Sequence, residues 1–230
     1  MIFTHNFSLK EVNPTMYRFF AQPQVDQLSH RIFGYEALLR KQKDDAWVLP
    51  DSFTEISVAD QAQLLKRTAT ALHVAATNQR LAFNLNNQQF RAPQTLDVIL
   101  ALKDQLGAVN LSIELTEAPT LAEVVHFSQI LHQHHIKLVI DDVGTGSNTY
   151  SNVAPFLPYV DEIKFAMQNY RSAGTPDKIP TALAFWAKIA QTYHLAMILE
   201  GVEDANDQTL AQHYGIRLHQ GYLYGKPALV

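Results

Sequence analysis

The sequence predicts an α/β fold in which strand–helix units close into a barrel. Short apolar runs alternate with longer amphipathic stretches along the chain, a pattern typical of parallel βα units. A polar residue ends nearly every expected strand. Such ends face one another on a common rim when a parallel sheet closes, whereas an open sheet spreads them along an edge. The first two expected strands are separated only by the short polar segment 27–30, which predicts an antiparallel hairpin.

Hydrophobic periodicity justifies each element in turn. The expected strands, in chain order, are 17–25, 31–39, 81–85, 109–115, 136–140, 160–165, 195–199 and 216–219. The expected helices are 58–76, 95–105, 121–134, a segment within 147–156, 181–193 and 205–214. Apolar residues that recur at steps of four and three from Val58 to Ala76 indicate the first helix. Thr120 is a suitable N-cap for the third helix, and Pro158 is expected to end the fourth.

Composition and charge exclude several classes of protein. The 230 residues include no cysteine, which excludes disulfide scaffolds and cysteine-based zinc sites. The formal net charge of −4 gives no electrostatic reason to expect a nucleic-acid polymer as partner. No apolar run approaches the roughly 18 residues of a membrane span, and residues 1–13 lack the apolar core of a signal peptide. We therefore expect a single cytoplasmic domain over residues 1–230, without a membrane partner and without a sensor domain, cyclase domain or linker.

The residues at the expected strand ends are mostly oxygen donors. They are Asn84, Glu114, Asp141, Asp142, Lys164, Glu200 and Gln220, and Glu36, within the second expected strand, adds a further carboxylate. Carboxylates gathered on one rim repel one another, and a hard divalent cation such as Mg²⁺ or Mn²⁺ removes that repulsion. Two adjacent aspartates allow one to bridge two ions, and ions roughly 3.5–4 Å apart are a common device for in-line displacement at phosphorus. Lys164 is then placed to stabilise developing charge or to hold the attacking water.

Each of these residues also has an ordinary structural interpretation when it is taken alone. A single glutamate at a strand end is more often solvated or salt-bridged. The Asp141–Asp142 pair before Gly144 and Gly146 fits a capped turn into a helix. Trp47, in a polar segment, either covers the rim or makes a minor packing contact. The metal hypothesis rests on the whole set, and it requires that these carboxylates meet without being neutralised by arginines and lysines.

Several segments of the chain resemble, in order, the motifs of one known family. They are Gln22-Pro23 with Val25-Asp26, Gly34-Tyr35-Glu36-Ala37-Leu38-Leu39-Arg40, Phe83-Asn84-Leu85, Glu114-Leu115-Thr116-Glu117, Asp141-Asp142-Val143-Gly144-Thr145-Gly146, Leu199-Glu200-Gly201-Val202-Glu203, Gln220-Gly221-Tyr222-Leu223 and Gly225-Lys226-Pro227. The family is that of the EAL domain, named for its Glu-Ala-Leu signature. The resemblance runs from about residue 16 to residue 228.

The resemblance implies a modified TIM (β/α) barrel with an antiparallel first strand. It also implies a metal-dependent phosphodiesterase that opens cyclic di-GMP to linear pGpG with two Mg²⁺ or Mn²⁺ ions, and a possible homodimer that pairs near the loop after Asp142. The implied first ion is held by Glu36, Asn84, Glu114 and Asp141, and the second by Asp141, Asp142 and Glu200. Lys164, Gln220 and Glu200 are implied in catalysis, with Glu117 bracing the loop after Asp142. Arg40, Gln22 and Leu39 are implied in substrate binding.

The chain departs from the family pattern on the side of the second ion. The family's Lys-Ile-Asp is Lys164-Phe165-Ala166 here, so one carboxylate is absent. Val143 and the segment 147–149 also differ. The leading hypothesis is therefore a phosphodiesterase whose activity the alanine lowers. The alternatives are a module that binds cyclic di-GMP or a protein without cleavage, and a hydrolase for another phosphodiester.

Overall fold

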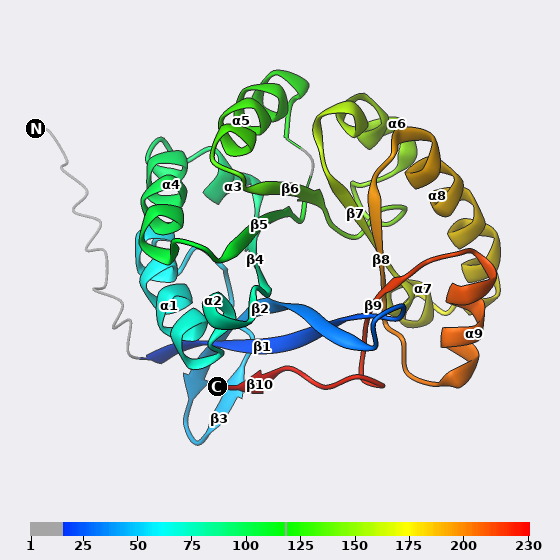
Figure 1. Cartoon of the computed structure of the whole chain (residues 1–230), viewed down its shortest axis with the longest axis horizontal. Coiled ribbons are helices and arrows are strands. Elements are labelled where there is room, and N and C mark those ends of the chain that lie inside the picture. Colours follow the sequence, from blue (N-terminus) through cyan, green and yellow to red (C-terminus); the bar gives the residue numbers. More distant parts are fainter. Residues whose placement is uncertain (1–15, 118) are drawn as a thin grey trace, which may run out of the picture.

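The structure is a computed structural model that describes residues 16–117 and 119–230. In these residues, eight strands close into a barrel that helices cover on the outside (Figure 1). The barrel strands are β1 (Tyr17–Asp26), β2 (Arg31–Lys43), β4 (Arg80–Leu85), β5 (Asn110–Leu115), β6 (Lys137–Ile140), β7 (Glu162–Ala166), β8 (Ala196–Glu200) and β9 (Leu218–Gln220). Two short strands extend the sheet: β3 (Ala46–Val48) pairs with β2, and β10 (Ala228–Leu229) pairs with β1.

Strand directions follow from the connections. β1 is antiparallel to both of its barrel neighbours, β2 and β9, whereas β2 and β4 to β9 pair in parallel. The short turn after β1 permits only an antiparallel partner, whereas the helical crossovers between later strands return the chain in the same direction. The predicted barrel with an antiparallel first strand is therefore confirmed.

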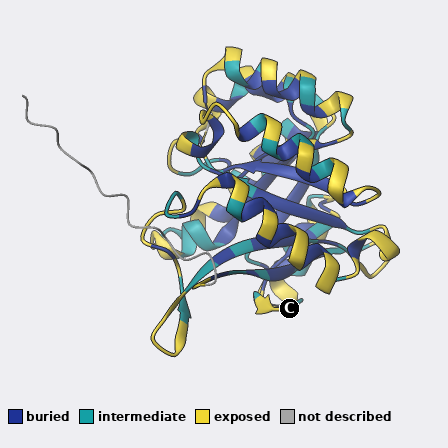
Figure 2. Cartoon of the chain, turned by 90° about the vertical axis from the view of Figure 1, so that its left-hand side faces the viewer, coloured by how far each residue is buried: buried dark blue, intermediate teal, exposed yellow. Residues whose placement is uncertain are grey.

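Helices connect the parallel strands and form the outer layer. They are α1 (Val58–Ala71), α2 (Val74–Thr77), α3 (Asn87–Phe90), α4 (Thr95–Leu106), α5 (Leu121–Gln133), α6 (Tyr150–Val153), α7 (Met167–Ser172), α8 (Ile179–Tyr193) and α9 (Ala205–His213), with 3₁₀ segments at Ala154–Tyr159 and Pro176–Lys178. Figure 2 shows buried strands inside a shell of helices whose outer faces are exposed. The apolar residues of strands and inner helix faces form the core.

Two predicted helices differ from the observed ones for local reasons. The expected helix 58–76 is divided because His73 adopts a left-handed conformation with φ of 55°, which ends the helical path between α1 and α2. The helix expected within 147–156 is only the four residues of α6, and Pro158 lies inside the 3₁₀ segment that follows. Trp47 lies in β3, with its ring centroid 5.8 Å from that of Phe20, and so makes a packing contact.

A chain of buried polar side chains runs through the barrel towards the predicted site. Arg80 on β4 donates from Nη1 to both oxygens of Glu162 on β7, at 2.9 and 2.8 Å. Its Nη2 donates to Gln24 Oε1 at 2.7 Å, and Gln24 Nε2 donates to Gln220 Oε1 at 2.9 Å. The bottom of the barrel thereby fixes the orientation of Gln220, whose amide reaches the rim.

Arg80→Met is expected to lower the free energy of unfolding by about 3–5 kcal/mol, since it leaves the buried Glu162 carboxylate without its cation. Denaturant melts at constant pH measure this change. The double variant Arg80→Met/Glu162→Met is expected to regain most of the loss, and equal stability of the wild type and the single variant would contradict the assigned role of the pair.

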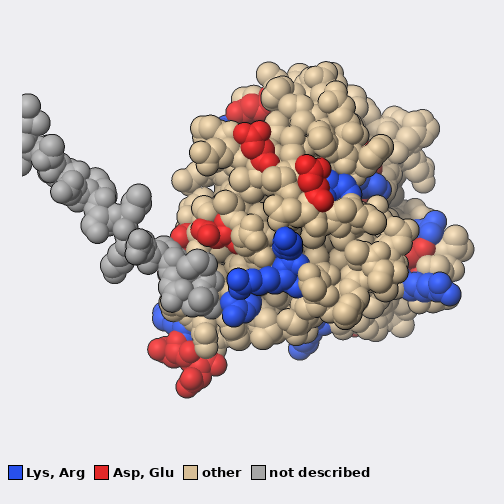
Figure 3. All heavy atoms as spheres, turned by 60° about the vertical axis from the view of Figure 1, so that its left-hand side comes forward, with Lys and Arg blue, Asp and Glu red and all other residues tan. Residues whose placement is uncertain are grey.

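One face of the molecule carries scattered charges of both signs (Figure 3). On the face drawn in Figure 3, Lys and Arg lie interspersed with Asp and Glu among uncharged residues. Among the described residues, every helix is too short or too polar to cross a bilayer. The expectation about a signal peptide concerns residues 1–13, which lie outside the described residues. For the same reason a single domain over residues 1–230 stays a prediction.

Candidate metal centre

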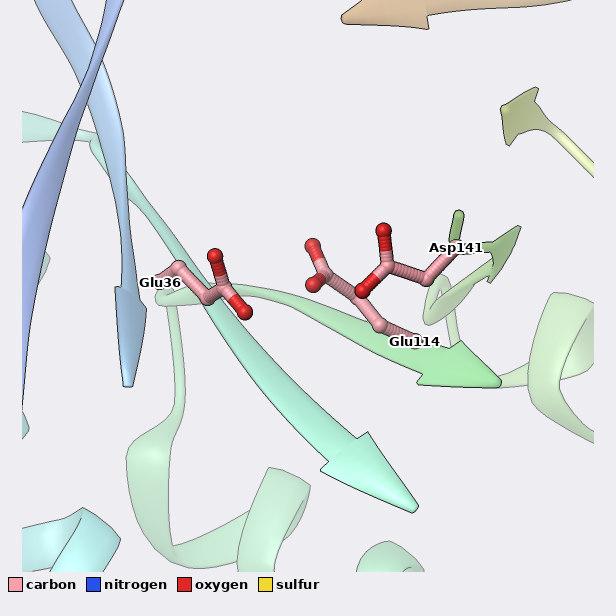
Figure 4. Close-up of side chains that lie close together, drawn as sticks. All are labelled: Glu36, Glu114 and Asp141. Atoms are coloured by element: carbon pink, nitrogen blue, oxygen red, sulfur yellow. The ribbon is translucent and has the colours of Figure 1, made fainter. Parts of the chain in front are cut away.

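Three carboxylates from separate strands meet inside one end of the barrel. Glu36 lies on β2, Glu114 on β5 and Asp141 directly after β6. One oxygen of each lies within 4.8 Å of the others, and Figure 4 shows the three side chains turned toward one another. The parallel register places Asn84 on β4 directly beside Glu114 on β5. The predicted convergence on one rim is thus observed.

A second group of carboxylates shares one member with the first. One oxygen each of Asp141, Asp142 and Glu200 also lies within 4.8 Å of the others. Glu36, Glu114, Asp141 and Glu200 are buried, and Asp142 is partly exposed. Asp141 therefore belongs to both sets of oxygen donors, and its implied role as a ligand that bridges two ions stays a prediction.

Lys164 occupies the centre of this ring. Its Nζ lies 2.5 Å from Glu200 Oε1, 2.7 Å from Glu114 Oε2, 3.2 Å from Glu36 Oε2 and 3.5 Å from Asp141 Oδ1. It is fully buried on β7. One lysine thus engages four carboxylates, and with Asp142 the five acidic groups still exceed it in charge. The condition that the carboxylates meet without basic partners is therefore not met in full: four of them are ion-paired with Lys164, whose single positive charge offsets only one negative charge.

Two amide side chains contact the ring, and some buried oxygen atoms of the site have no hydrogen-bond partner among the described residues. Glu36 accepts from Asn84 Nδ2 at 2.6 Å and from Gln220 Nε2 at 2.5 Å. Among the described residues, the buried atoms Asn84 Oδ1 and Glu114 Oε1 have no hydrogen-bond partner. A buried oxygen without a partner is costly. Because carboxylate and amide oxygens are the ligands that Mg²⁺ and Mn²⁺ prefer, this donor set fits a divalent ion held by Glu36, Asn84, Glu114 and Asp141.

Burial and mutual repulsion shift the pKa values of the ring. Burial is the largest influence on Asp141 and Glu200, and it raises the pKa of each to about 7 against the pull of Lys164. Burial also raises the pKa of Glu114 well above its usual range, and that of Asp142. For Glu36, burial is outweighed by Lys164 and the two amide donors, so its pKa is lowered. In the absence of a cation, part of the ring therefore holds protons near neutral pH.

Metal-free protein is expected to lose stability as pH rises from about 5 to about 7. The folded state keeps protons on Asp141 and Glu200, whose pKa values are raised to about 7, whereas the unfolded chain has released them. The free energy of unfolding therefore falls with pH across that window. Asp26, with a lowered pKa, and Glu55 and Glu123, with pKa values near 2, act in the opposite direction, but their contribution is complete above about pH 5.

Thermal melts with a chelator and with Mn²⁺ measure this dependence. Because metal ligands must be deprotonated, Mn²⁺ is expected to raise the melting temperature more at about pH 8 than at about pH 6. A Mn²⁺-induced shift that is the same at both pH values would contradict the protonated ring.

The loop after Asp141 is fixed by its backbone. Asp142 has a left-handed φ of 52°, and its amide donates to Asp141 Oδ1 at 2.8 Å. Asn148 Nδ2 donates to the carbonyl oxygens of Asp141 at 2.7 Å and Thr116 at 3.1 Å. Gly144 has a φ of +88°, and a Cβ there would lie 2.6 Å from Trp186 Nε1, so only glycine fits. The implied bracing role of Glu117, which is exposed beside this loop, stays a prediction.

Two adjoining cavities open onto the ring. One, of about 470 Å³, is lined by Leu39, Arg40, Asn84 and Glu117, and the other, of about 320 Å³, by Gln22, Glu200 and Gln220. Both are also lined by Glu36, Leu38, Asp141 and Asp142. The predicted substrate-binding residues thus divide between two lobes that meet at the carboxylates.

Three polar residues of the site were not predicted from the sequence. Gln24 connects Gln220 to the barrel interior, and Gln168 and Asn169, at the start of α7, donate to Glu200 and Asp142. A signal for Gln168 and Asn169 does exist, because these two polar residues follow the end of barrel strand β7 after one apolar residue, Met167. The signal for Gln24 is a polar residue within an apolar strand.

The sequence model of the EAL domain matches residues 14–227. The chain belongs to the EAL domain family. Among curated relatives, the Escherichia coli (strain K12) cyclic di-GMP phosphodiesterase PdeL is 30% identical over 210 residues, covering 84% of this chain and 58% of that protein. The probable cyclic di-GMP phosphodiesterase PdeD of the same organism is 26% identical over 224 residues, covering 92% of this chain and 41% of that protein. This EAL domain thus spans about half the length of these relatives.

Solved structures share the barrel. The PaMucR phosphodiesterase in complex with c-di-GMP has a TM-score of 0.79 at 20% identity, over 94% of this chain and 93% of that one. Bacillus subtilis YkuI, an EAL-domain protein in complex with substrate c-di-GMP and calcium, has a TM-score of 0.76 at 18% identity, over 95% and 57% of the two chains. Klebsiella pneumoniae BlrP1 in a manganese/cy-diGMP complex has a TM-score of 0.70 at 24% identity, over 96% and 62%. At these identities the likeness establishes the fold of this EAL domain.

Proposed function

We propose that this EAL domain is a metal-dependent phosphodiesterase that hydrolyses cyclic di-GMP to linear pGpG. The observation that carries the proposal is the pair of carboxylate sets that share Asp141, with the unpartnered oxygens of Asn84 and Glu114 beside them. The relatives named as cyclic di-GMP phosphodiesterases support the choice of substrate. The calcium and manganese in two related complexes support a divalent ion.

The chain's own residues divide the work. Glu36, Asn84, Glu114 and Asp141 hold one ion, and Asp141, Asp142 and Glu200 hold a second. When bound, Mg²⁺ or Mn²⁺ polarises a phosphoryl oxygen and lowers the pKa of a water molecule beside it. Lys164 keeps a fixed positive charge next to the reacting phosphate, since the surrounding carboxylates hold its pKa well above the usual range. Lys164 and Gln220 orient the attacking water. Its oxygen forms a new bond to phosphorus as the bond from phosphorus to the 3′ oxygen breaks, and the proton lost by the water balances the one gained by the leaving 3′ hydroxyl.

The two lobes of the cavity fit a ligand made of two nucleotide halves. Arg40 lines one lobe and Gln22 the other. The planar guanidinium of Arg40 suits the oxygens of the second phosphate, and Leu39 lines the same lobe as Arg40. A cyclic dinucleotide that bridges the lobes places one phosphate over the ring of carboxylates, where both lobes share their lining.

The test is incubation of purified protein with cyclic di-GMP in Mn²⁺, in Mg²⁺ and with a chelator, with the products separated by chromatography. We expect linear pGpG with either metal and none with the chelator. The absence of pGpG at high enzyme concentration would reject the proposal. The same assay with generic phosphodiesters tests the alternative that the protein hydrolyses a phosphodiester other than cyclic di-GMP.

A second candidate function is a module that binds cyclic di-GMP without cleaving it. Ala166, buried at the end of β7 where the family pattern has an aspartate, favours it. Calorimetry distinguishes the two functions, because metal-independent binding without turnover identifies the module. A cytoplasmic location remains part of the proposal. So does a homodimer that pairs near the loop after Asp142, and sedimentation analysis tests whether the protein is a dimer.

A further inference from the structure

Ala166 leaves the second set of carboxylates one oxygen donor short. It is the last residue of β7 and is in register with Glu200 on β8. Partners in register place their side chains on the same face of a sheet, so a buried methyl group lies beside Glu200 where a carboxylate would complete the set. The set of Asp141, Asp142 and Glu200 therefore leaves coordination positions of a hard cation, which takes about six oxygen atoms, to water or to a further side chain.

Two amide side chains from the first turn of α7 lie against this set. Gln168 Nε2 donates to Glu200 Oε2 at 3.1 Å. Asn169 Nδ2 donates to Asp142 Oδ1 at 2.7 Å and to Thr145 Oγ1 at 3.1 Å. Gln168 Oε1 is buried, and among the described residues it has no hydrogen-bond partner. Gln168 thus carries an unused amide oxygen on a side chain that contacts Glu200, the residue in register with Ala166.

The backbone holds Gln168 in this position. Gly201, with a φ of +72°, lies under the amide, and a Cβ on Gly201 would lie 2.3 Å from Gln168 Oε1. Arg171, on the same helix, donates to the Gly201 carbonyl oxygen and to Asp207 Oδ1, both at 2.6 Å. The first turn of α7 is therefore anchored to the segment after β8, and Gln168 has little freedom except rotation of its terminal amide.

We propose that Gln168 supplies the missing oxygen ligand of the second ion, and that Asn169 orients Asp142 beside it. This inference rests on the proposed metal site. Next to carboxylates alone, an amide presents its N–H groups, as Gln168 does toward Glu200. The terminal torsion of glutamine is broad and roughly two-fold. A cation beside Glu200 therefore favours the rotated amide, in which Oε1 rather than Nε2 points toward Glu200.

The exchange of a carboxylate for an amide makes the two ion sites unequal. The second site loses one negative charge, whereas the first keeps its full set of donors. Loss of a ligand or of its supporting partner typically weakens a metal site about 10–100-fold. The protein is therefore expected to bind one ion tightly and a second at least about 10-fold more weakly.

The experiment is a Mn²⁺ titration followed by electron paramagnetic resonance of free Mn²⁺, without nucleotide. It compares wild type with Gln168→Ala, Gln168→Glu and Ala166→Asp, and uses Gln191→Ala, an exposed glutamine on α8, as matched control. Circular dichroism confirms that each variant is folded. Gln168→Ala is expected to weaken the weaker site about 10–100-fold and to leave the tighter site unchanged. Gln168→Glu and Ala166→Asp are expected to strengthen the weaker site, and Gln191→Ala to change neither.

Two results would overturn the inference. If the Mn²⁺ dissociation constants of Gln168→Ala equalled those of the wild type, Gln168 would not contact the ion. If Gln168→Glu weakened Mn²⁺ binding at the weaker site as much as Gln168→Ala does, Gln168 would only donate a hydrogen bond to Glu200. Glutamate keeps an oxygen ligand but has no N–H to donate. The absence of a tight Mn²⁺ site in the wild type would reject the proposed function together with the inference. That result differs from the two above, in which the wild type still binds Mn²⁺ tightly.

Discussion

Glu36→Ala is expected to reduce hydrolysis of cyclic di-GMP by at least about 100-fold. Substitution of a group that merely supports a metal ligand already lowers metal affinity or activity by about 10–100-fold. Glu36 is itself a proposed ligand. Its carboxylate also receives the amides of Asn84 and Gln220 and lies 3.2 Å from Lys164 Nζ. The variant therefore removes a ligand and releases two side chains that flank it.

The measurement is the rate of pGpG formation at saturating Mn²⁺. Glu36→Gln keeps the shape of the side chain, and we expect a comparable loss because the charge is absent. Glu123→Ala, which removes a carboxylate paired with Arg91 on the surface, serves as the control and should retain activity. Wild-type rates in both Glu36 variants would show that Glu36 is not a ligand.

Lys164→Met is expected to reduce turnover by about 10²–10³-fold, the usual effect of removing one preorganised group that stabilises charge in a transition state. It should also destabilise the metal-free protein by about 3–5 kcal/mol at about pH 8, since the buried carboxylates lose their internal cation. The destabilisation should shrink toward about pH 6, because Asp141 and Glu200, with pKa values near 7, take up protons.

Denaturant melts at the two pH values, with and without Mn²⁺, check the second effect. Mn²⁺ is expected to restore most of the lost stability, because it replaces the missing positive charge. Lys188→Met, an exposed lysine on α8, is the matched control. If Lys164→Met were as stable as wild type at both pH values, the lysine would not be balancing the ring.

Much of the fold was predictable from the sequence because its signals are local. The hairpin of β1 and β2 and the alternation of later strands and helices follow from periodicity within short windows. The division of the helix expected over 58–76 was not predictable, because nothing in the apolar pattern marks the left-handed conformation of His73. The 3₁₀ segment around Pro158 was missed because proline there was interpreted as a helix end.

The candidate site was predictable in its membership but not in its electrostatics. Glu114, Asp141 and Glu200 lie at or directly after strand ends, and the structure brings them together with Glu36 from within β2. That Lys164 lies among four of these carboxylates depends on side-chain directions across the barrel. The roles of Gln24 and Gln168 arise from partners far away in sequence, Arg80 and Glu200. Such long-range contacts leave no periodic signal.

Anomalous diffraction from a crystal soaked with Mn²⁺ and cyclic di-GMP tests the central claim most directly. We expect manganese peaks among Glu36, Asn84, Glu114 and Asp141 and between Asp141, Asp142 and Glu200, with the nucleotide spanning both lobes of the cavity. A ring of carboxylates still paired with Lys164, without manganese and with the nucleotide elsewhere, would contradict it.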